Sequence, residues 1–500
     1  MSQNDQGNVF RRLFPDERED CAPVILDDAG RWWNRGELET VINRLAGALL
    51  DRGIEAGDRV GAKIEKSVYA LCLYLATLKI GAVWLPINPG YTKAEVNVLL
   101  SDAQPKVLIV AKPEDVEGAT CATMASDGSG SLTASGTSRG CDICLVPRGS
   151  GDLAAILYTS GTTGSPKGAM ITHGNLGYCA NALGHAWKVS AEDTLLHVLP
   201  MFHAHGLFIA ANTMLAFGGR MLFVAKFDAK QVVELLPNVT IFMGVPTLYA
   251  RMLARERLTR ELCRNIRLFT SGSAPLSSEL FKEFHLRTGH SILERYGMTE
   301  TTIIASNPLA GERVPGSVGF ALPGLTVRVL RSDGHIAAVD EVAELIVKGP
   351  NVFAGYWNLP ERTAEEFTPE GYFMTRDLAR IDGHGRIWIV GRSKDLIITG
   401  GYNVYPREVE NSLNEIVEVR DSAVIGVPHP DFGEGVVAVV ELNEASASFD
   451  GESALRILAT SLAKHKVPKL IFVVPSLPRN AMGKVQKGEL RKSFANAFAC

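Results

Sequence analysis

Neither sign of charge dominates this 500-residue chain, and it has no long basic run. It holds 51 lysine and arginine residues against 55 aspartate and glutamate residues, so its formal net charge is only −4. Proteins that bind nucleic acid or anionic membranes usually carry clustered positive charge. We therefore expect neither nucleic acid nor a membrane surface as a partner.

Long apolar runs are also lacking. The longest, ALCLYLATL from Ala70, ends at Lys79 and is much shorter than the roughly 20 residues of a membrane-spanning helix, so we interpret it as a buried helix. The N-terminal residues MSQNDQGNVFRRLFPDERED contain no apolar core of signal-peptide length, and their acidic cluster argues against a transit peptide. A cytoplasmic location is expected.

The eight cysteines lack the spacing of a disulfide framework. Cys141 and Cys144 do form a C-x-x-C, but no second pair follows nearby in the sequence, as a metal site would need. The pair also lies in a loop rich in Ser and Gly, whereas a redox pair sits at the start of a helix. We expect reduced thiols with no chemical role.

What the chain does contain is a repeated alternation of helical and strand patterns. Helical apolar spacing covers residues 40–54 and 67–80, and strand-type runs cover 81–89 and 106–111. This alternation predicts an α/β fold, with parallel sheets and helices on their faces. The stretch 116–151 is rich in Ser, Thr and Gly and is expected to be a surface loop. The length of the chain calls for two or more domains.

A Gly-rich loop follows the apolar run 153–157, and a helix is expected to begin near His173. Its glycines let the backbone turn its N–H groups inward, and its hydroxyls and lysine add donors, which suits a polyphosphate. The spacing is not that of the P-loop of kinases and GTPases. The alternative is a plain flexible hairpin loop. The candidate phosphate-binding residues are Thr159, Ser160, Gly161, Thr162, Thr163, Gly164 and Lys167.

This loop, YTSGTTGSPKG, resembles the phosphate-loop signature of the acyl-adenylating superfamily, which includes acyl-CoA synthetases, firefly luciferase and the adenylation domains of peptide synthetases. Five further segments agree with that family, in its order, so the resemblance covers roughly the whole chain. These segments are PMFHAHG (200–206), SGSAPL (271–276), YGMTET (296–301), GRSKDLIITGGYNVYPREVE (391–410) and PRNAMGKVQK (478–487).

The resemblance implies a large N-terminal domain of sheets flanked by helices, residues 1–393, and a small mobile α+β C-terminal domain, residues 394–500. It also implies a two-step reaction that uses ATP, Mg²⁺ and CoA. The carboxylate of an acid attacks the α-phosphate of ATP, and a thiolate then displaces AMP from the acyl-adenylate. Positioning and neutralisation of charge are the main tasks of the protein in such a reaction.

The same resemblance implies roles for single residues. Glu300 would bind the magnesium ion, Tyr296 would pack on the adenine, and Thr299 would donate to the α-phosphate. Asp377 and Arg392 match the positions that contact the ribose. Other residues expected around the nucleotide are Gly272, Ser273, Ala274, Pro275, Glu294, Arg295, Gly297 and Met298. The residues expected to act in catalysis are Lys484, Glu300, Thr159 and His205.

Lys484 corresponds to the lysine that the C-terminal domain of the family carries into the active site. There it would bridge the carboxylate oxygen and the α-phosphate. Lys394 occupies the hinge position about which that domain swings for the second step. The swing would bring Gly400, Gly401 and Tyr402 to the substrate, where two glycines allow close approach to the narrow pantetheine arm of CoA.

Arg295 stands where many relatives carry a small residue, close to the path of the acyl chain. A guanidinium there suits a second carboxylate on the substrate, which it can hold in a bidentate pair. The segments ERYGMTE and PMFHAHGLF resemble the malonyl-CoA synthetase branch, which implies malonate as the acid, with His205 and Ser273 as further neighbours. The alternative is that Arg295 pairs with Glu294, Glu300 or a surface acid.

Two positions depart from the family pattern. Arg376 replaces the glycine that usually precedes the ribose-binding aspartate, and it would strain the backbone if its φ is positive. Ala204 stands where malonate-activating relatives tend to carry Thr, so the pocket has room for a substituent such as that of methylmalonate.

Three other functions stay open: a CoA ligase for another small carboxylic acid, a module that feeds a carrier protein, and a non-catalytic nucleotide-binding paralogue. The expected partners are a small dicarboxylic acid and CoA, and a monomer is compatible with the sequence.

Overall fold

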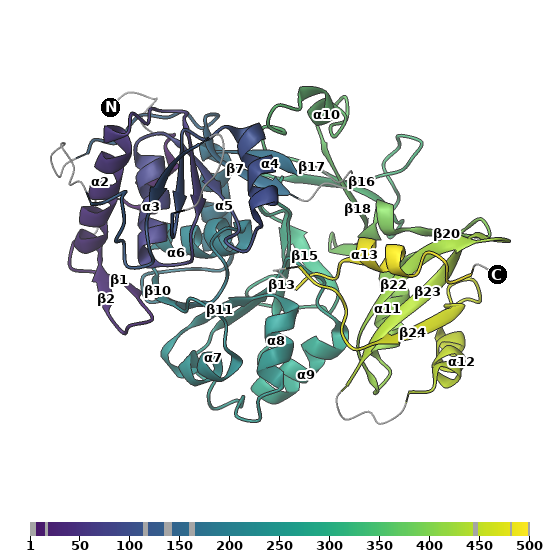
Figure 1. Ribbon diagram of the computed structural model, residues 1–500. Coiled ribbons are helices and arrows are strands. Elements are labelled where there is room, and N and C mark those ends of the chain that lie inside the picture. Colours follow the sequence, from purple (N-terminus) through teal and green to yellow (C-terminus); the bar gives the residue numbers. More distant parts are fainter. Residues whose placement is uncertain are drawn as a thin grey trace.

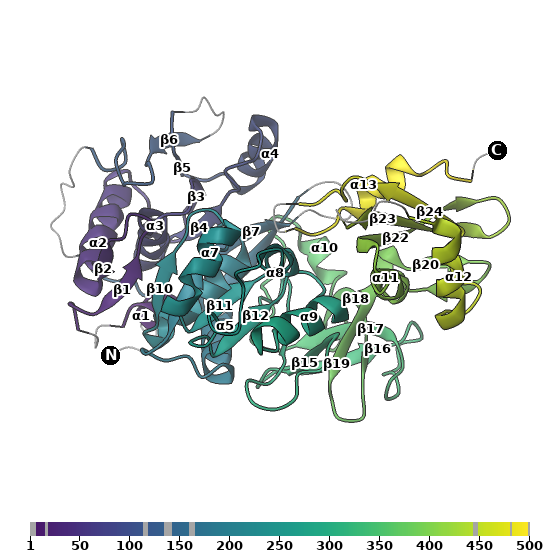
Figure 2. The ribbon, with the colours of Figure 1, turned by 90° about the horizontal axis from the view of Figure 1, so that it is seen from below.

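Three β-sheets organise the part of the chain that the structure describes, two in the N-terminal domain and one in the C-terminal domain (Figure 1). The C-terminal domain stands to one side of the N-terminal sheets in both views (Figure 2). The structure is a computed structural model that describes residues 7–15, 19–113, 119–134, 143–159, 166–443, 449–480 and 483–498.

The six-stranded sheet has the order β6-β5-β3-β4-β7-β8. All neighbouring strands are parallel except β7 and β8, which form an antiparallel hairpin. Its strands are β3 (Arg59–Lys63), β4 (Val83–Pro86), β5 (Val107–Val110), β6 (Thr120–Thr123), β7 (Leu153–Thr159) and β8 (Lys167–Thr172). Three helices belong to this part of the chain: α2 (Arg35–Asp51), α3 (Val68–Lys79) and α4 (Lys93–Ala103). As predicted from its apolar run, α3 is buried along its whole length apart from Tyr69.

The second sheet has thirteen strands in the order β16-β17-β18-β19-β15-β14-β13-β12-β11-β9-β10-β1-β2. The run from β13 to β1 is parallel, and its inner strands β9, β11 and β12 are buried at every residue, as expected for strands covered on both faces. The strands are β1 (Pro23–Leu26), β2 (Trp32–Asn34), β9 (Thr194–His197), β10 (Arg220–Phe223), β11 (Ile241–Gly244), β12 (Leu268–Ser271), β13 (Leu293–Tyr296), β14 (Ala305–Ser306), β15 (Ser317–Ala321), β16 (Thr326–Leu330), β17 (Ala343–Lys348), β18 (Phe373–Ile381) and β19 (Ile387–Arg392).

The remaining helices of this domain are mostly short. Their bounds are α1 (Val9–Leu13), α5 (His173–Ala186), α6 (Asn212–Phe217), α7 (Ala229–Leu235), α8 (Pro246–Leu253), α9 (Ser278–Thr288) and α10 (Pro360–Ala364), with a π-helix η2 (His205–Ala211) and 3₁₀ turns η3 (Leu236–Asn238) and η4 (Ser393–Asp395). The helix predicted near His173 is confirmed as α5, whose N-cap Thr172 accepts a hydrogen bond from the backbone N–H of Asn175.

The C-terminal sheet has the order β21-β20-β23-β22, with β24 pairing β23 in parallel. Alternate residues of β22 and β23 enter two separate apolar clusters on the two faces of the sheet, as the two-residue period of a strand requires. The elements are β20 (Ile397–Thr399), β21 (Tyr402–Val404), α11 (Pro406–Asn414), β22 (Val419–His429), β23 (Gly433–Leu442), α12 (Gly451–Ser461), β24 (Leu470–Val474) and α13 (Lys487–Ser493). The predicted fold class, a large α/β domain followed by a small α+β domain, is confirmed.

Some expected boundaries are wrong. Helix α2 begins at Arg35 rather than near residue 40, because Asn34 and Glu37 form a capping box there. The stretch expected to be a loop at 116–151 contains strand β6, in which only Ala122 is buried, so the strand carries little apolar pattern. The phosphate loop returns as strand β8 from Lys167. Cys141 lies outside the described residues. No helix in the described part of the chain is both long and apolar enough to cross a membrane.

Candidate active site

The predicted segments meet at the carboxyl ends of two neighbouring parallel strands, β12 and β13. Ser271 at the end of β12 is opposite Glu294 in β13, so the next residues along, Gly272 and Arg295, also come together. Ligands of open α/β sheets bind at these ends of the strands. The SGSAPL (271–276) and ERYGMTE (294–300) segments therefore form one wall.

The phosphate-loop candidates lie in the hairpin between β7 and β8, where Thr159 is paired with Lys167. Lys167 is buried, with its Nζ 3.8 Å from Oε1 of Glu366 and 4.8 Å from the ring centre of Tyr356. The hairpin thus presents a lysine from its second strand. Five of the predicted phosphate contacts lie outside the described residues: Ser160, Gly161, Thr162, Thr163 and Gly164.

Glu300 is a buried carboxylate that accepts a hydrogen bond of 3.0 Å from the hydroxyl of Tyr356. Burial raises its pKa, although Lys167 and Arg392 nearby oppose that shift. No group of three His, Cys, Asp or Glu side chains in the described residues could hold a metal ion. A single carboxylate beside a phosphate site fits Mg²⁺, which usually takes one or two carboxylates and completes its shell with phosphate oxygens and water.

Tyr296, Asp377 and Arg392, predicted for the adenosine half of the nucleotide, are in direct contact. The hydroxyl of Tyr296 donates a hydrogen bond to Oδ2 of Asp377, and Nε of Arg392 lies 3.0 Å from Oδ1. Asp377 and Arg392 face each other in register across β18 and β19. The carboxylate of Asp377 raises the pKa of Arg392, so the guanidinium stays charged.

Lys484 of the C-terminal domain is docked against the N-terminal domain. A Cβ built on Gly483 would stand 2.5 Å from Oγ1 of Thr247 in α8, and the φ of Gly483 is +72°, so glycine is needed at this close approach. The backbone N–H of Lys484 donates to Oδ1 of Asn480 at 3.0 Å. Burial, helped by Arg392, lowers the pKa of Lys484 to about 8. The side chain of Lys484 is therefore mostly a protonated ammonium at neutral pH, and it loses its charge at a lower pH than an ordinary lysine.

Glu294 connects the two domains through its side chain. It lies 3.8 Å from Arg407 of α11 and accepts a hydrogen bond from the backbone N–H of Leu276. Burial raises its pKa to about 7, and Arg407 opposes the shift. The Glu294 carboxylate is therefore engaged by the protein itself.

Arg295 is buried, and its Nε and Nη2 atoms have no hydrogen-bond partner among the described residues. The two glutamates considered above as partners of Arg295 interact with other residues. Glu294 pairs with Arg407, and Glu300 accepts a hydrogen bond from Tyr356. Burial lowers the pKa of Arg295 to about 10, so it remains a cation at neutral pH. A buried cation without hydrogen-bonding partners is costly, and this one calls for an anionic ligand.

His205 and Ser273, the other predicted substrate neighbours, are joined by a hydrogen-bonding contact of 3.1 Å between Nδ1 and Oγ. Burial holds the pKa of His205 well below its ordinary value, and the nearby Arg295 adds to the effect, so the imidazole is neutral. Its Nε2 is buried without a partner in the described structure. His205 opens the π-helix η2, and π-helices are frequent at functional sites. Ala204, which precedes it, packs against the core.

The residues predicted for the attack of the CoA thiolate lie in the C-terminal domain and in the turn that leads into it. Lys394 is in the turn η4, directly after β19 of one sheet and before β20 of the next. Gly400 and Gly401, with φ of +57° and +82°, form the tight turn between β20 and β21. Tyr402 is 60% exposed and stacks on His465 at 4.7 Å. The backbone N–H of Gly400 donates to the backbone oxygen of Phe432 in the same domain at 2.9 Å, whereas Gly483, beside Lys484, contacts α8 of the N-terminal domain.

Two residues at the site carried no signal in the sequence. Tyr356 holds Glu300, and Glu366 is the carboxylate nearest to Lys167. Both follow YGMTET by more than 50 residues and belong to no motif that we recognised. Their role depends on contacts that only the folded chain makes.

The second domain brings a partly buried lysine to these strand ends. The comparisons with known proteins place the chain in a chemical class, the AMP-forming acid–CoA ligases. The chain belongs to the AMP-binding enzyme family: the model of the AMP-binding enzyme matches residues 16–357, and the model of the AMP-binding enzyme C-terminal domain matches residues 408–484.

Among solved structures, the chain is 45% identical to ATP-bound MatB from Rhodopseudomonas palustris, over 98% of this chain and 99% of that one, with a TM-score of 0.95. Apo MatB from the same organism gives a TM-score of 0.85 at the same identity, so the structure described here superposes better on the ATP-bound form. The malonate–CoA ligase of Arabidopsis thaliana is 32% identical over 98% of this chain and 89% of its own length. A feruloyl-CoA synthase from an Amycolatopsis species is 36% identical, over 92% of this chain and 93% of its own length.

Proposed function

We propose that this protein is a malonyl-CoA synthetase, which joins malonate to CoA through malonyl-AMP and releases AMP and pyrophosphate. The observation that carries the proposal is the buried guanidinium of Arg295 with two unpartnered nitrogens. Malonate has two carboxylates, so one can react while the other forms a charge-assisted bidentate pair with Arg295. His205 and Ser273 lie beside that position and complete the substrate pocket.

A monocarboxylic acid would leave the cation of Arg295 buried and unpaired, which disfavours it as substrate. The malonate–CoA ligase among the relatives supports a dicarboxylate. The feruloyl-CoA synthase shows that relatives of comparable similarity use other acids, so the argument for malonate depends on the pocket rather than on overall similarity.

In the first half-reaction, a carboxylate oxygen of malonate attacks the α-phosphorus of ATP, and the bond to pyrophosphate breaks. Lys484 stabilises the charge that moves between the carboxylate and the α-phosphate, which requires its protonated form. Lys167 and the hairpin from Thr159 hold the β- and γ-phosphates. Glu300 is the residue that would hold Mg²⁺, which neutralises phosphate charge when it is bound.

The adenosine occupies the side of the site formed by Tyr296, Asp377 and Arg392. Oδ2 of Asp377 already accepts a hydrogen bond from Tyr296, and Oδ1 forms an ion pair with Arg392, so the ribose hydroxyls would exchange with these partners. The ATP-bound state of MatB supports ATP as the nucleotide. The backbone around the nucleotide comes from Gly272, Ser273, Ala274, Pro275, Glu294, Gly297, Met298 and Thr299.

In the second half-reaction, the thiolate of CoA attacks the acyl carbon and AMP leaves. The C-terminal domain turns about Lys394, withdraws Lys484 and brings the turn at Gly400, Gly401 and Tyr402 to the substrate. A domain movement of this kind separates two reactions that need different groups in one place.

The test is a panel of mono- and dicarboxylic acids with ATP, Mg²⁺ and CoA, in which AMP, pyrophosphate and the acyl-CoA are measured. We expect malonate to give AMP and malonyl-CoA at the highest kcat/KM. Release of ADP and phosphate, or a preference for a monocarboxylic acid, would overturn the proposal.

A further inference from the structure

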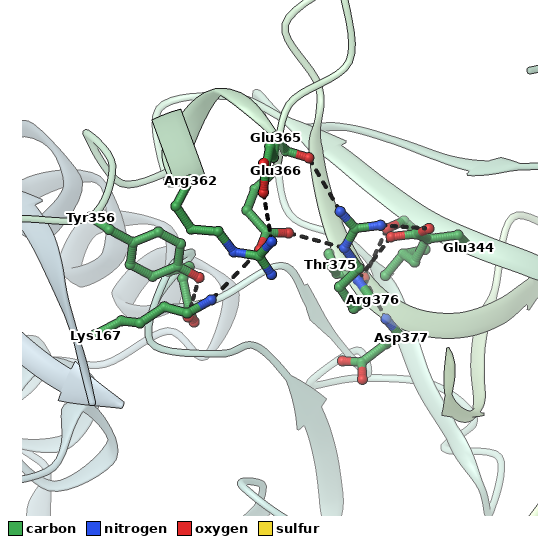
Figure 3. Close-up of polar contacts among 11 residues, drawn as sticks. Lys167, Glu344, Tyr356, Arg362, Glu365, Glu366, Thr375, Arg376 and Asp377 are labelled. Atoms are coloured by element: carbon green, nitrogen blue, oxygen red, sulfur yellow. Dashed lines mark hydrogen bonds and ion pairs between the residues drawn. The ribbon is translucent and has the colours of Figure 1, made fainter. Parts of the chain in front are cut away.

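Arg376 is held in a strained backbone conformation by three acidic neighbours (Figure 3). Its φ is +60°, in the left-handed region that favours glycine over other residues. Its Nε lies 3.0 Å from Oε2 of Glu366, and its Nη2 donates to the backbone oxygen of Glu365 at 3.2 Å. Its backbone N–H donates to Oε1 of Glu344 at 3.0 Å. These contacts offset the strain at this position.

Glu366, the main partner of Arg376, is shared by three cations. Its side chain is only 5% exposed, and it lies 3.0 Å from Arg362, 3.0 Å from Arg376 and 3.8 Å from Lys167 (Figure 3). The longest of these three ion pairs is the one to Lys167. Because two guanidiniums already neutralise Glu366, its attraction for the ammonium of Lys167 is weakened.

Arg376 also directly precedes Asp377, and Lys167 is the first residue of β8, the second strand of the phosphate hairpin. The hydroxyl of Thr375, on the other side, donates to the backbone oxygen of Leu345 at 2.8 Å. Arg376 therefore lies between the residues proposed for the ribose and the lysine proposed for the β- and γ-phosphates, and Glu366 is the group that connects it to that lysine (Figure 3).

We propose that Arg376 is a positioning residue for ATP, which occupies Glu366 so that Lys167 is free to turn from that carboxylate to the phosphates. The inference rests on the proposed role of Lys167 in binding ATP, although not on the identity of the acid. Without Arg376, Glu366 keeps one guanidinium and draws Lys167 into a closer ion pair. ATP then has to compete with Glu366 for the lysine.

The first variant that tests this is Arg376→Asn, because Asn tolerates the left-handed conformation and carries no charge. We expect the dissociation constant of MgATP, measured by calorimetry without any acid, to rise about three- to tenfold. The KM for ATP should rise in parallel, whereas the KM for malonate should stay within about twofold. Arg376→Lys, which keeps the charge, should recover part of the affinity.

Arg380→Ala is the matched control, since Arg380 lies on the same strand and pairs with Asp340 near the surface. It should leave both KM values unchanged. A purely structural role of Arg376 would lower thermal stability and affect malonate and ATP alike. A loss that both substrates share, or an unchanged affinity for MgATP, would overturn the inference.

The second test is a double-mutant cycle with Glu366→Gln. If Arg376 acts through Glu366, Arg376→Asn should have little further effect on MgATP affinity once the carboxylate is gone, so the two effects are not additive. Additive effects would contradict the proposed route. If Glu366→Gln does not fold, the comparison of Arg376→Asn with Arg376→Lys decides the question alone.

These outcomes are separate from those of the proposed function. If the wild-type protein binds MgATP and forms AMP with an acid other than malonate, the function proposed above fails and the calorimetric test of Arg376 still applies. If malonate is the substrate and substitution of Arg376 leaves the affinity for MgATP unchanged, only the proposed role of Arg376 fails.

Discussion

The guanidinium of Arg295 lies directly on the backbone of Gly272. A Cβ at Gly272 would stand 2.5 Å from both Cζ and Nε of Arg295, closer than such atoms approach in proteins. The two residues are brought together by the parallel pairing of β12 with β13. Because Arg295 is buried, its head group has little room to move aside, so residue 272 controls where the cation points.

Gly272→Ala should therefore displace the guanidinium and impair the use of malonate. A misplacement of about 1 Å can cost up to about 100-fold in rate, and we expect kcat/KM for malonate to fall by about 10- to 100-fold. Gly151→Ala is the control, because a Cβ there meets nothing within 4 Å and its φ is not positive. An unchanged kcat/KM for malonate in Gly272→Ala would show that the position of the Arg295 head group does not matter.

Lys484→Ala should separate the two half-reactions. We expect malonate-dependent exchange of pyrophosphate into ATP to be lost, because the ammonium that bridges carboxylate and α-phosphate is gone. Formation of malonyl-CoA from supplied malonyl-AMP should continue at a rate close to that of the wild type. Lys492→Ala, an exposed lysine of the same C-terminal segment, is the control. Equal losses in both half-reactions would argue against a lysine that acts in one step only.

The pH dependence of the first half-reaction should also reveal the titration of the Lys484 side chain. Its pKa is lowered from 10.5 to about 8, so the ammonium predominates well below pH 8 and is lost as the pH rises through that value. Since adenylation needs the charged form, its kcat/KM should fall above about pH 8. Thioester formation from malonyl-AMP should not fall in this range, because CoA reacts as its thiolate. A first half-reaction with a constant kcat/KM between pH 7 and pH 10 would contradict this assignment.

Ala204→Thr should narrow the range of carboxylic acids that the enzyme accepts as substrates. Ala204 directly precedes His205, which is in contact with Ser273, and its side chain is partly buried against the core. We propose that this side chain lines the malonate position. Methylmalonate should be accepted by the wild type with a modest penalty, because one methyl group is worth only about 1–3 kcal/mol in a pocket. The measurement is the ratio of kcat/KM for malonate and methylmalonate in the two proteins. A ratio that Ala204→Thr leaves unchanged would mean that residue 204 does not line the pocket.

Much of the architecture could be predicted because apolar periodicity marks buried elements clearly. The buried helix at α3 and the start of α5 follow directly from such patterns. Strand β6 could not be predicted, because it is short and only one of its residues, Ala122, is buried. Strand β8 was hidden by the Gly-rich loop that precedes it.

The site was predictable only where residues belong to motifs. Tyr296, Asp377 and Arg392 were expected near one ligand. The fold brings Tyr296 into contact with Asp377 over 81 residues of sequence, and Arg392 pairs with the same carboxylate. Sequence alone could not show that Glu366 gathers Arg362, Arg376 and Lys167, since each contact joins different elements. The sequence could not give the φ of Arg376 either. The structure shows that this φ is positive, so the backbone strain expected for a residue other than glycine is present. The ion pairs of the Arg376 side chain offset that strain.

The central claim is that Arg295 binds a second carboxylate of the substrate. Arg295→Gly removes the guanidinium, whereas Arg295→Lys keeps the charge without the bidentate geometry and serves as the matched variant. A charge-assisted bidentate pair contributes about 1.5–3 kcal/mol, equivalent to roughly 10- to 150-fold in affinity.

The most direct measurement is the ratio of kcat/KM for malonate to that for acetate, in the wild type and in Arg295→Gly. We expect the wild type to favour malonate strongly. In the variant, malonate should lose roughly 10- to 150-fold while acetate changes little or improves, with Arg295→Lys in between. A parallel loss for both acids, or a wild type that prefers acetate, would contradict the claim.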